Sequence, residues 1–238
     1  MRYRKIYLFL VLMAFWIVEV WNWGYLRGIG SISDSRKFIN INSSDMGYHS
    51  FILVGTIYSL LFLYFNALSL NIIREPYMIR MGRKTYIGRE FVKTYKNAIV
   101  FSFLFTFTNV IGNLIFVDHR LLVEYNIIVG SILYFISMIF YYCIIGSIYL
   151  IAWSYTKKSQ TALWISGIIV TALIGLYIIF HYPTLIMDVN IISDFYEGNF
   201  VMIQYIVRLI KNIIVVVLLH FMAKMVFERT DIIFYYEE

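Results

Sequence analysis

The sequence predicts an all-α polytopic membrane protein. Hydrophobic residues fill 61% of its 238 positions and charged residues only 14%, whereas a soluble domain carries about 25% charged residues. Six apolar stretches are present, and a helix needs about 20 apolar residues to cross a bilayer. Lysine and arginine collect in alternate loops. We therefore expect a single transmembrane domain over residues 1–238, with six transmembrane helices.

The apolar stretches define the expected spans. They cover about residues 5–23, 49–73, 97–117, 126–155, 161–181 and 201–226. The basic start of the first span also fits a signal peptide, but tryptophans replace the small-residue cleavage site, so an uncleaved span is expected. The sixth span contains Arg208 and Lys211, and an alternative start near residue 209 would leave Arg208 in an interfacial helix. The loop at 24–48 is expected to be irregular, and a short helix ended by Gly198 is expected within 182–200.

The distribution of lysine and arginine sets the orientation. With the N-terminus inside, the cytosolic segments hold fourteen of the twenty, the outer segments four and the sixth span two. Cytoplasmic loops are the ones enriched in these residues. Both termini are therefore expected in the cytosol of a multi-pass protein of the cell membrane. The basic inner face indicates anionic lipid headgroups or an acidic protein surface as partners, and no nucleic acid.

The sequence carries no pattern of a catalytic or metal site. Cys143 is the single cysteine, and the four histidines never occur at i, i+4 spacing, so no metal site is expected. Residues 82–85 have the wrong order for a phosphate-binding loop, which argues against a nucleotide site in this chain. We therefore expect no enzymatic activity and no cofactor bound by the chain itself.

Small and amide residues in the spans indicate close helix packing. Gly167, Thr171 and Gly175 recur every four residues in span five, where small side chains let another helix approach. Asn109 and Asn113 in span three can form hydrogen bonds between helices. Packing within the chain and a dimer interface both fit these patterns.

Polar residues inside the spans are candidates for a substrate path. Those of span six form one stripe, and Arg208 lies about 10 Å deep if the span starts near residue 201, at 1.5 Å per residue. A charge at mid-membrane costs roughly 2.5–3.5 kcal/mol on insertion scales, so the stripe should face protein or water. Glu19 of span one is within reach of Arg208, and we expect them to pair. The candidate path comprises Glu19, Asn109, Asn113, Gln204, Arg208, Lys211 and Asn212.

A basic island at residues 74–96 separates spans two and three. It holds seven of the twenty lysines and arginines. Pro76 suits the first position of a helix and Gly82 its end, and Thr85 can cap a second helix that leads into span three. The pattern predicts a cytosolic helical hairpin, and an ordinary basic loop that holds the orientation is the alternative.

Six spans, cytosolic termini and this island resemble a permease subunit of an ABC type-2 transporter. Such permeases of Gram-positive peptide exporters often carry an Arg-x-Gly-x-basic-x-x-aromatic pattern in the island, and the stretch from Arg80 to Tyr86, RMGRKTY, is similar. The resemblance implies a coupling helix that sits in a groove of a cytosolic ABC ATPase subunit, which binds ATP and Mg. It also implies a second permease chain, identical or a sister. The coupling residues that it implies are Tyr77, Met78, Arg80, Met81, Arg83, Lys84, Tyr86 and Arg89.

The expected function is therefore the membrane subunit of an ATP-driven exporter for a hydrophobic or amphipathic substrate, such as an antimicrobial or cytolytic peptide. A non-transporting immunity or assembly protein and a stand-alone secondary transporter are the alternatives. The latter would need ion sites near the bilayer midplane and usually paired repeats, and the sequence suggests neither. An intramembrane enzyme is disfavoured because no catalytic set is apparent.

Overall fold

The computed structural model describes residues 2–27, 32–43, 47–70, 82–180 and 190–229. Within these ranges the regular structure is helical, apart from one isolated parallel bridge between Ile32 and Val117. The elements are α1 (Arg2–Arg27), α2 (Ser35–Asn42), the π-helix η1 (Leu53–Tyr58), α3 (Ser59–Ser69), α5 (Arg83–Phe116), α6 (His119–Glu124), α7 (Ile127–Thr156), α8 (Ser159–Phe180), α9 (Ile191–Tyr196) and α10 (Met202–Arg229).

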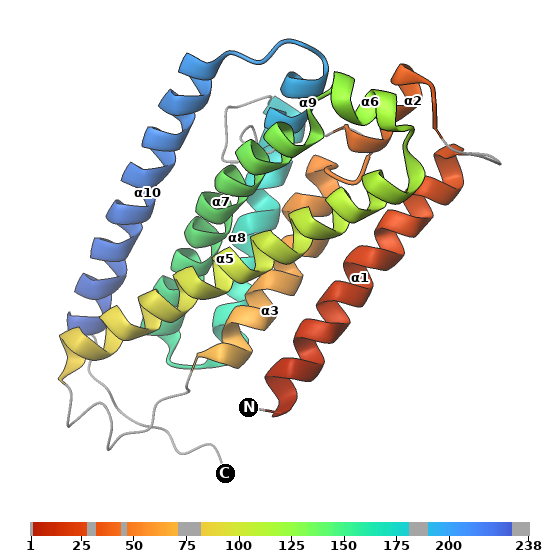
Figure 1. The fold of residues 1–238 in the computed structure, drawn as a ribbon. Helices are drawn as coiled ribbons and strands as arrows, with labels where there is room; N and C mark the ends of the chain where they lie inside the picture. Colours follow the sequence, from red (N-terminus) through yellow and green to blue (C-terminus); the bar gives the residue numbers. More distant parts are fainter. Residues whose placement is uncertain (1, 28–31, 44–46, 71–81, 181–189, 230–238) are drawn as a thin grey trace.

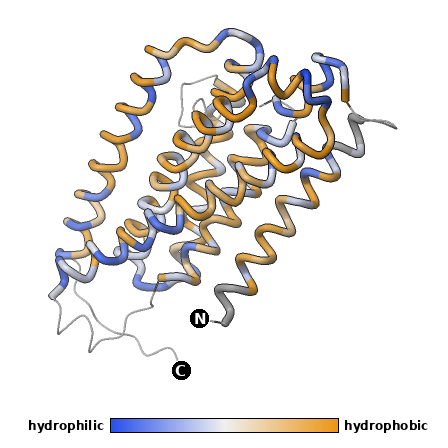
Figure 2. Tube along the Cα trace, viewed as in Figure 1, coloured by the Kyte–Doolittle hydropathy of each residue, from blue (hydrophilic) through white to orange (hydrophobic). Residues whose placement is uncertain are grey.

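Four of the described helices, α5, α7, α8 and α10, are long and apolar enough to cross a membrane, by length and composition. They coincide with the last four expected spans. The first two expected spans coincide with shorter apolar helical segments, Ile6–Asn22 and Leu53–Ser69. Figure 2 shows hydrophobic residues along the long helices and hydrophilic residues mainly towards the two ends of the bundle. The chain thus has the character of a helical membrane protein, while six crossings and their direction stay predictions.

Helix α7 forms the centre of the bundle. It packs against α5, α8 and α10, and α5 packs in turn against α1 and α3. Figure 1 shows α10 along one side of α7 and α1 on the opposite side, with α5 crossing the bundle diagonally. One end of the bundle carries the short helices α2, α6 and α9, which we call the outer end after the predicted orientation. The starts of α1 and α5 and the end of α10 lie at the other, inner end.

Helix α5 joins the second helix expected in the basic island to span three. It runs without a break for 34 residues from Arg83, and Gly82, with a φ of +75°, occupies its N-cap position. The expected helix that leads into span three is therefore confirmed, whereas its expected cap at Thr85 is wrong. Glycine adopts a positive φ at low cost, so the chain turns into the helix there. At 1.5 Å per residue α5 is about 51 Å long, against a hydrocarbon core of about 30 Å.

The loop between the first two apolar segments is more ordered than expected. Asp34 caps α2, since its carboxylate accepts a hydrogen bond from the backbone N–H of Arg36 at 2.9 Å. Phe38 and Ile41 lie on one face of α2 and are fully buried. A capped amphipathic helix thus covers the outer end where an irregular loop was expected. The expected short helix before Gly198 is confirmed as α9.

Candidate functional site

Five buried polar side chains from four parts of the chain meet at the outer end. Each is at most 1% exposed, although the group includes a carboxylate and an imidazole. We call this group the outer polar cluster: Glu19 of α1, Asn42 of α2, His49 before η1, and Asn109 and Asn113 of α5. Ionisable side chains in such surroundings are rare and mark functional or tightly paired positions.

Asn109 is the centre of the cluster. Its Nδ2 donates hydrogen bonds to Glu19 Oε1 and to Asn42 Oδ1, both at 3.2 Å. Its Oδ1 lies 3.0 Å from Asn113 Nδ2 and 3.2 Å from His49 Nε2. A carbonyl oxygen only accepts, so this arrangement assigns the proton of neutral His49 to Nε2.

Reciprocal hydrogen bonds between two side-chain amides attach α2 to α5. Asn42 Nδ2 donates to Asn113 Oδ1 at 3.0 Å, and Asn113 Nδ2 donates to Asn42 Oδ1 at 3.1 Å. Gly112 makes room for the contact between α1 and α5, because a Cβ atom there would overlap the Glu19 side chain. Removing one partner of a buried hydrogen bond lowers stability by about 1–3 kcal/mol. The cluster therefore holds α1, α2 and α5 in one arrangement.

Aromatic rings join three helices at the inner end. The ring of Phe227 in α10 lies between Tyr86 of α5 and Trp153 of α7, with centroid distances of 6.0 and 5.9 Å and nearly parallel planes. Lys157 Nζ lies 4.6 Å from the centroid of the Phe227 ring. We call these four residues the inner aromatic junction. It connects the basic start of α5 to the ends of α7 and α10.

The charges around this junction come from the same three helices. Arg83 Nη1 donates to the Glu228 carbonyl oxygen at 3.4 Å, and Lys84 Nζ lies 4.0 Å from the Glu228 carboxylate. Burial, and secondly the positive charge of Arg83, lower the pKa of Lys157 to about 8. Lys84 is 73% exposed, so its ion pair contributes little to stability. The buried rings, rather than the ion pair, hold the junction together.

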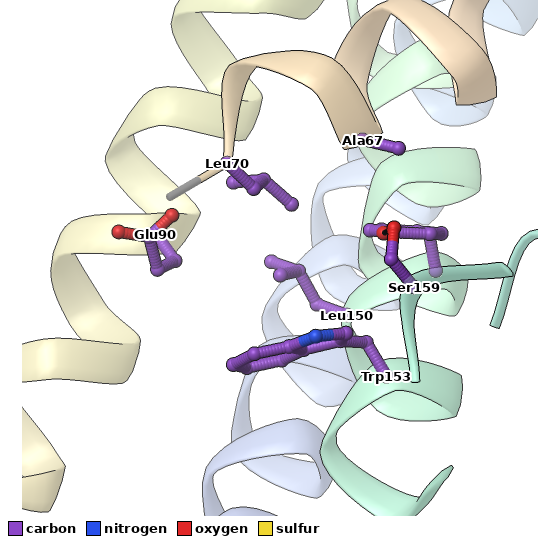
Figure 3. Close-up of a pocket in the computed structure, with 7 residues that line it drawn as sticks. Ala67, Leu70, Glu90, Leu150, Trp153 and Ser159 are labelled. Atoms are coloured by element: carbon purple, nitrogen blue, oxygen red, sulfur yellow. Dashed lines mark hydrogen bonds between the residues drawn. The ribbon is translucent and has the colours of Figure 1, made fainter. Parts of the chain in front are cut away.

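A small pocket lies beside the junction. Figure 3 shows Glu90 of α5 across from Leu150 and Trp153 of α7, with Leu70 directly after α3 and Ser159 of α8 at its margin. The Glu90 carboxylate accepts a hydrogen bond from Lys93 Nζ at 2.5 Å. The enclosed space of about 10 Å³ admits about one water molecule, so the pocket is too small for a peptide substrate.

The described residues offer no ready metal site. No group of three or more His, Cys, Asp or Glu side chains among them could hold a metal ion. No model of a protein family matches the chain, and no curated protein or solved structure matches it either.

The expected coupling residues fall into two sets. Tyr77, Met78, Arg80 and Met81 lie outside the described residues. Those that are described begin α5: Arg83, Lys84, Tyr86 and Arg89. The three basic side chains among them are exposed, but the Tyr86 side chain is 4% exposed and packs on Phe227. Tyr86 is therefore a contact inside the chain rather than a contact for a partner.

The expected pair of Glu19 with Arg208 is wrong. Arg208 Nη1 lies 3.3 Å from the Asp194 carboxylate of α9, and Glu19 bonds to Asn109. The two residues were matched by depth along the membrane normal, but α1 and α10 lie on opposite sides of α7 (Figure 1). The polar stripe of span six is therefore separate from Glu19.

The other residues of that stripe do not share one environment. Asn212 is buried, whereas Gln204 and Lys211 are exposed on the surface of α10. Of the seven residues of the candidate path, the structure brings together Glu19, Asn109 and Asn113 alone.

The small residues of span five pack only at one position. Gly167 of α8 is buried, and a Cβ atom there would lie 3.1 Å from Leu60 Cδ2, so the close approach expected there is confirmed. Gly175 has nothing within 4 Å of its Cβ position. Thr171 is exposed, and its hydroxyl donates to the Gly167 carbonyl at 2.8 Å. The expectation of packing at Thr171 and Gly175 within the chain is therefore wrong.

Two members of the outer polar cluster were missed in the sequence. Asn42 lies in a loop that was expected to be irregular, and His49 lies at a membrane boundary, where histidine is ordinary. The spacing of Phe38 and Ile41 at i, i+3 and the aspartate before the segment are the signals that predict a capped helix there. No comparable local signal identifies His49, because its partners are distant in the sequence.

Proposed function

We propose that this chain is the membrane-spanning permease subunit of an ATP-driven ABC exporter. The substrate would be a hydrophobic or amphipathic molecule, such as an antimicrobial or cytolytic peptide. The observation that supports this proposal best is the inner aromatic junction, because it connects the basic start of α5 to two other long helices. A chain that uses a partner's ATP hydrolysis needs such a mechanical connection.

The connection extends through the whole bundle. A force on the start of α5 would act on Phe227 and Trp153 through Tyr86, because closely packed rings transmit displacement. The same helix continues unbroken to Asn109 and Asn113, which hold α1 and α2 at the outer end. A movement that starts at the cytosolic surface would thus reach the outer polar cluster.

The partner would be a cytosolic ABC ATPase subunit that binds ATP and Mg. Arg80, Arg83, Lys84 and Arg89 would meet acidic or backbone acceptor groups in its groove, and Tyr77, Met78 and Met81 would supply apolar contact. Tyr86 would transmit the movement rather than touch the partner. The complete transporter would contain a second permease chain in the cell membrane, with six spans and cytosolic termini in each chain.

Charge reversal at the start of α5 tests this proposal. The tagged chain is purified from its own cells in mild detergent, and the amount of co-purifying ATPase and its hydrolysis rate are measured. Arg89→Glu should strongly reduce the retained ATPase, whereas Arg120→Glu, a matched exposed position on α6 at the other end, should not. A chain that purifies alone, or equal retention by both variants, would contradict the proposal.

A secondary transporter is the second candidate. The observation that favours it is the outer polar cluster, in which a buried carboxylate and a buried imidazole share Asn109 as hydrogen-bond partner. Such groups between helices are typical of ion-coupled transport. Transport by the purified chain alone, abolished by an ionophore and independent of ATP, would favour this candidate over the permease.

A further inference from the structure

One face of α5 changes from basic to apolar along its length. Arg89, Lys93 and Lys96 follow one another at i, i+4 and i+7, so they lie on the same side of the helix. Arg89 and Lys96 are exposed, and the side chain of Lys93 is 30% exposed. Beyond them the same side carries apolar residues that are 46–51% exposed. We call this surface the α5 stripe, and it comprises Val92, Lys93, Lys96, Ile99, Phe103 and Phe107.

The basic part of the stripe lies in a stretch with net positive charge. Over residues 89–96, one arginine and two lysines outweigh the single carboxylate of Glu90, which leaves a net charge of +2. Glu90 accepts one hydrogen bond from Lys93 Nζ at 2.5 Å, and an ammonium group has three N–H donors. Lys93 and Lys96 can therefore both donate to an anion that approaches the exposed face.

The stripe has about the length of one bilayer leaflet. About 20 helical residues span a hydrocarbon core of about 30 Å. Counted back from Phe116 at the outer end of α5, the inner boundary of the core falls near Lys96, and the diagonal course of α5 in Figure 1 moves it towards Lys93. From Lys96 to Phe107 the stripe extends about 16 Å, about half of the core. The lysines thus lie at the level of the headgroups and the apolar residues at the level of the acyl chains.

Aromatic rings form the deeper part of the stripe. The rings of Phe103 and Phe107 stack with their centroids 5.3 Å apart. The ring of Phe135 from α7 meets Phe103 edge-on at 6.4 Å. The stripe therefore runs beside the contact between α5 and α7, where a flexible acyl chain gains dispersion contacts with several rings.

We propose that the α5 stripe binds one anionic phospholipid. Its phosphate accepts charge-assisted hydrogen bonds from Lys93 and Lys96. One of its acyl chains lies along Ile99, Phe103 and Phe107. A soluble acidic protein could also meet the lysines, but it could not cover apolar residues at the depth of the hydrocarbon core. A lipid covers both parts, and when bound it fixes the depth of α5 in the membrane.

Quenching of a fluorophore by brominated lipids tests this site. Ile99→Cys is labelled with a thiol-reactive bimane in the purified full chain, where the native Cys143 is buried. The labelled chain is reconstituted into phosphatidylcholine vesicles with increasing amounts of brominated phosphatidylglycerol or, in parallel, brominated phosphatidylcholine. We expect phosphatidylglycerol to bind at position 99 about fivefold more tightly, which corresponds to about 1 kcal/mol. The same label at Ile168, exposed on α8, should be quenched equally by both lipids.

Lysine variants show which side chains select the lipid. Lys96→Gln leaves the pair of Glu90 and Lys93 in place and should lower the preference at position 99. Lys93→Gln together with Lys96→Gln should abolish it. Lys158→Gln, the same charge change at an exposed position before α8, should keep the fivefold preference.

Two results would overturn the proposal. One is equal quenching by the two lipids at position 99, which would leave the lysines to an acidic protein partner. The other is an unchanged preference in the double variant. Because no ATPase is present and neither Lys93 nor Lys96 is an expected coupling residue, such a failure would not affect the proposed permease function.

Discussion

Asn109 joins three helices at the scale of a single residue, since its side chain on α5 forms hydrogen bonds with Glu19 of α1 and Asn42 of α2. That Asn109 and Asn113 bond between helices follows from their type and position in an apolar helix, and the structure confirms it. Their partner Asn42 could not be predicted, because a hydrogen bond across 67 residues depends on how α2 folds back over the bundle. The expected pair of Glu19 with Arg208 is wrong for the same reason. The depth of a residue along its helix can be counted in the sequence, but which helices lie side by side cannot.

Lys157 gives a prediction at this scale. Its pKa is lowered from 10.5 to about 8 by burial and by Arg83, so between these values the unfolded chain binds more protons than the folded one. Stability must then increase as pH rises from 8 to 10.5, while below pH 8 the destabilisation is fully present. We expect the midpoint of thermal unfolding in detergent to rise over this window relative to Lys157→Met. Lys158→Met, at the exposed neighbour, should keep the wild-type pH dependence, and an identical profile in Lys157→Met would contradict the assignment.

At the scale of elements, hydropathy was enough to find the long helices but not their full extent. The apolar stretches that predicted α5, α7, α8 and α10 are a property of local composition. The predicted positions of these helices therefore agree with the structure. The basic first turns of α5 look like a loop by hydropathy, yet they continue the helix. Tyr86 and Ile87 explain this, since both are buried against the rest of the bundle. Tertiary packing thus supports the expected helix in this charged segment and joins it to span three without a break.

The inner aromatic junction predicts unequal roles for two phenylalanines of α10. Phe227 is fully buried against two rings, whereas Phe221, six residues earlier, is 57% exposed. Truncating a buried phenylalanine to alanine costs about 3–5 kcal/mol through lost burial and a cavity. Phe227→Ala should therefore lower the unfolding temperature in detergent far more than Phe221→Ala. Equal effects would show that the junction does not hold α10 to α5 and α7.

The whole molecule has two unlike ends joined by the same long helices. At the inner end, α10 is held by Phe227, and at the outer end by Tyr205, whose hydroxyl donates to the Leu133 carbonyl of α7 at 2.8 Å. Between these two points α10 exposes most of its apolar side chains, as expected for a helix whose surroundings are lipid or another membrane chain. The outer end is covered by α2, α6 and α9, whereas the inner end carries the basic residues of α5 (Figure 1). The count of lysine and arginine predicts that the basic end faces the cytosol, and this orientation stays a prediction.

The asymmetry predicts how single cysteines will react across the membrane. Arg36 on α2 and Glu197 after α9 are exposed at the outer end, and Lys84 and Lys158 are exposed at the inner end. The native Cys143 is buried in α7 and should react slowly with a membrane-impermeant maleimide. Cysteines at 36 and 197 should then be labelled on intact cells, and those at 84 and 158 only after permeabilisation, because basic segments stay in the cytosol. Labelling of position 84 on intact cells would reverse the orientation, and with it the contact between the start of α5 and a cytosolic ATPase.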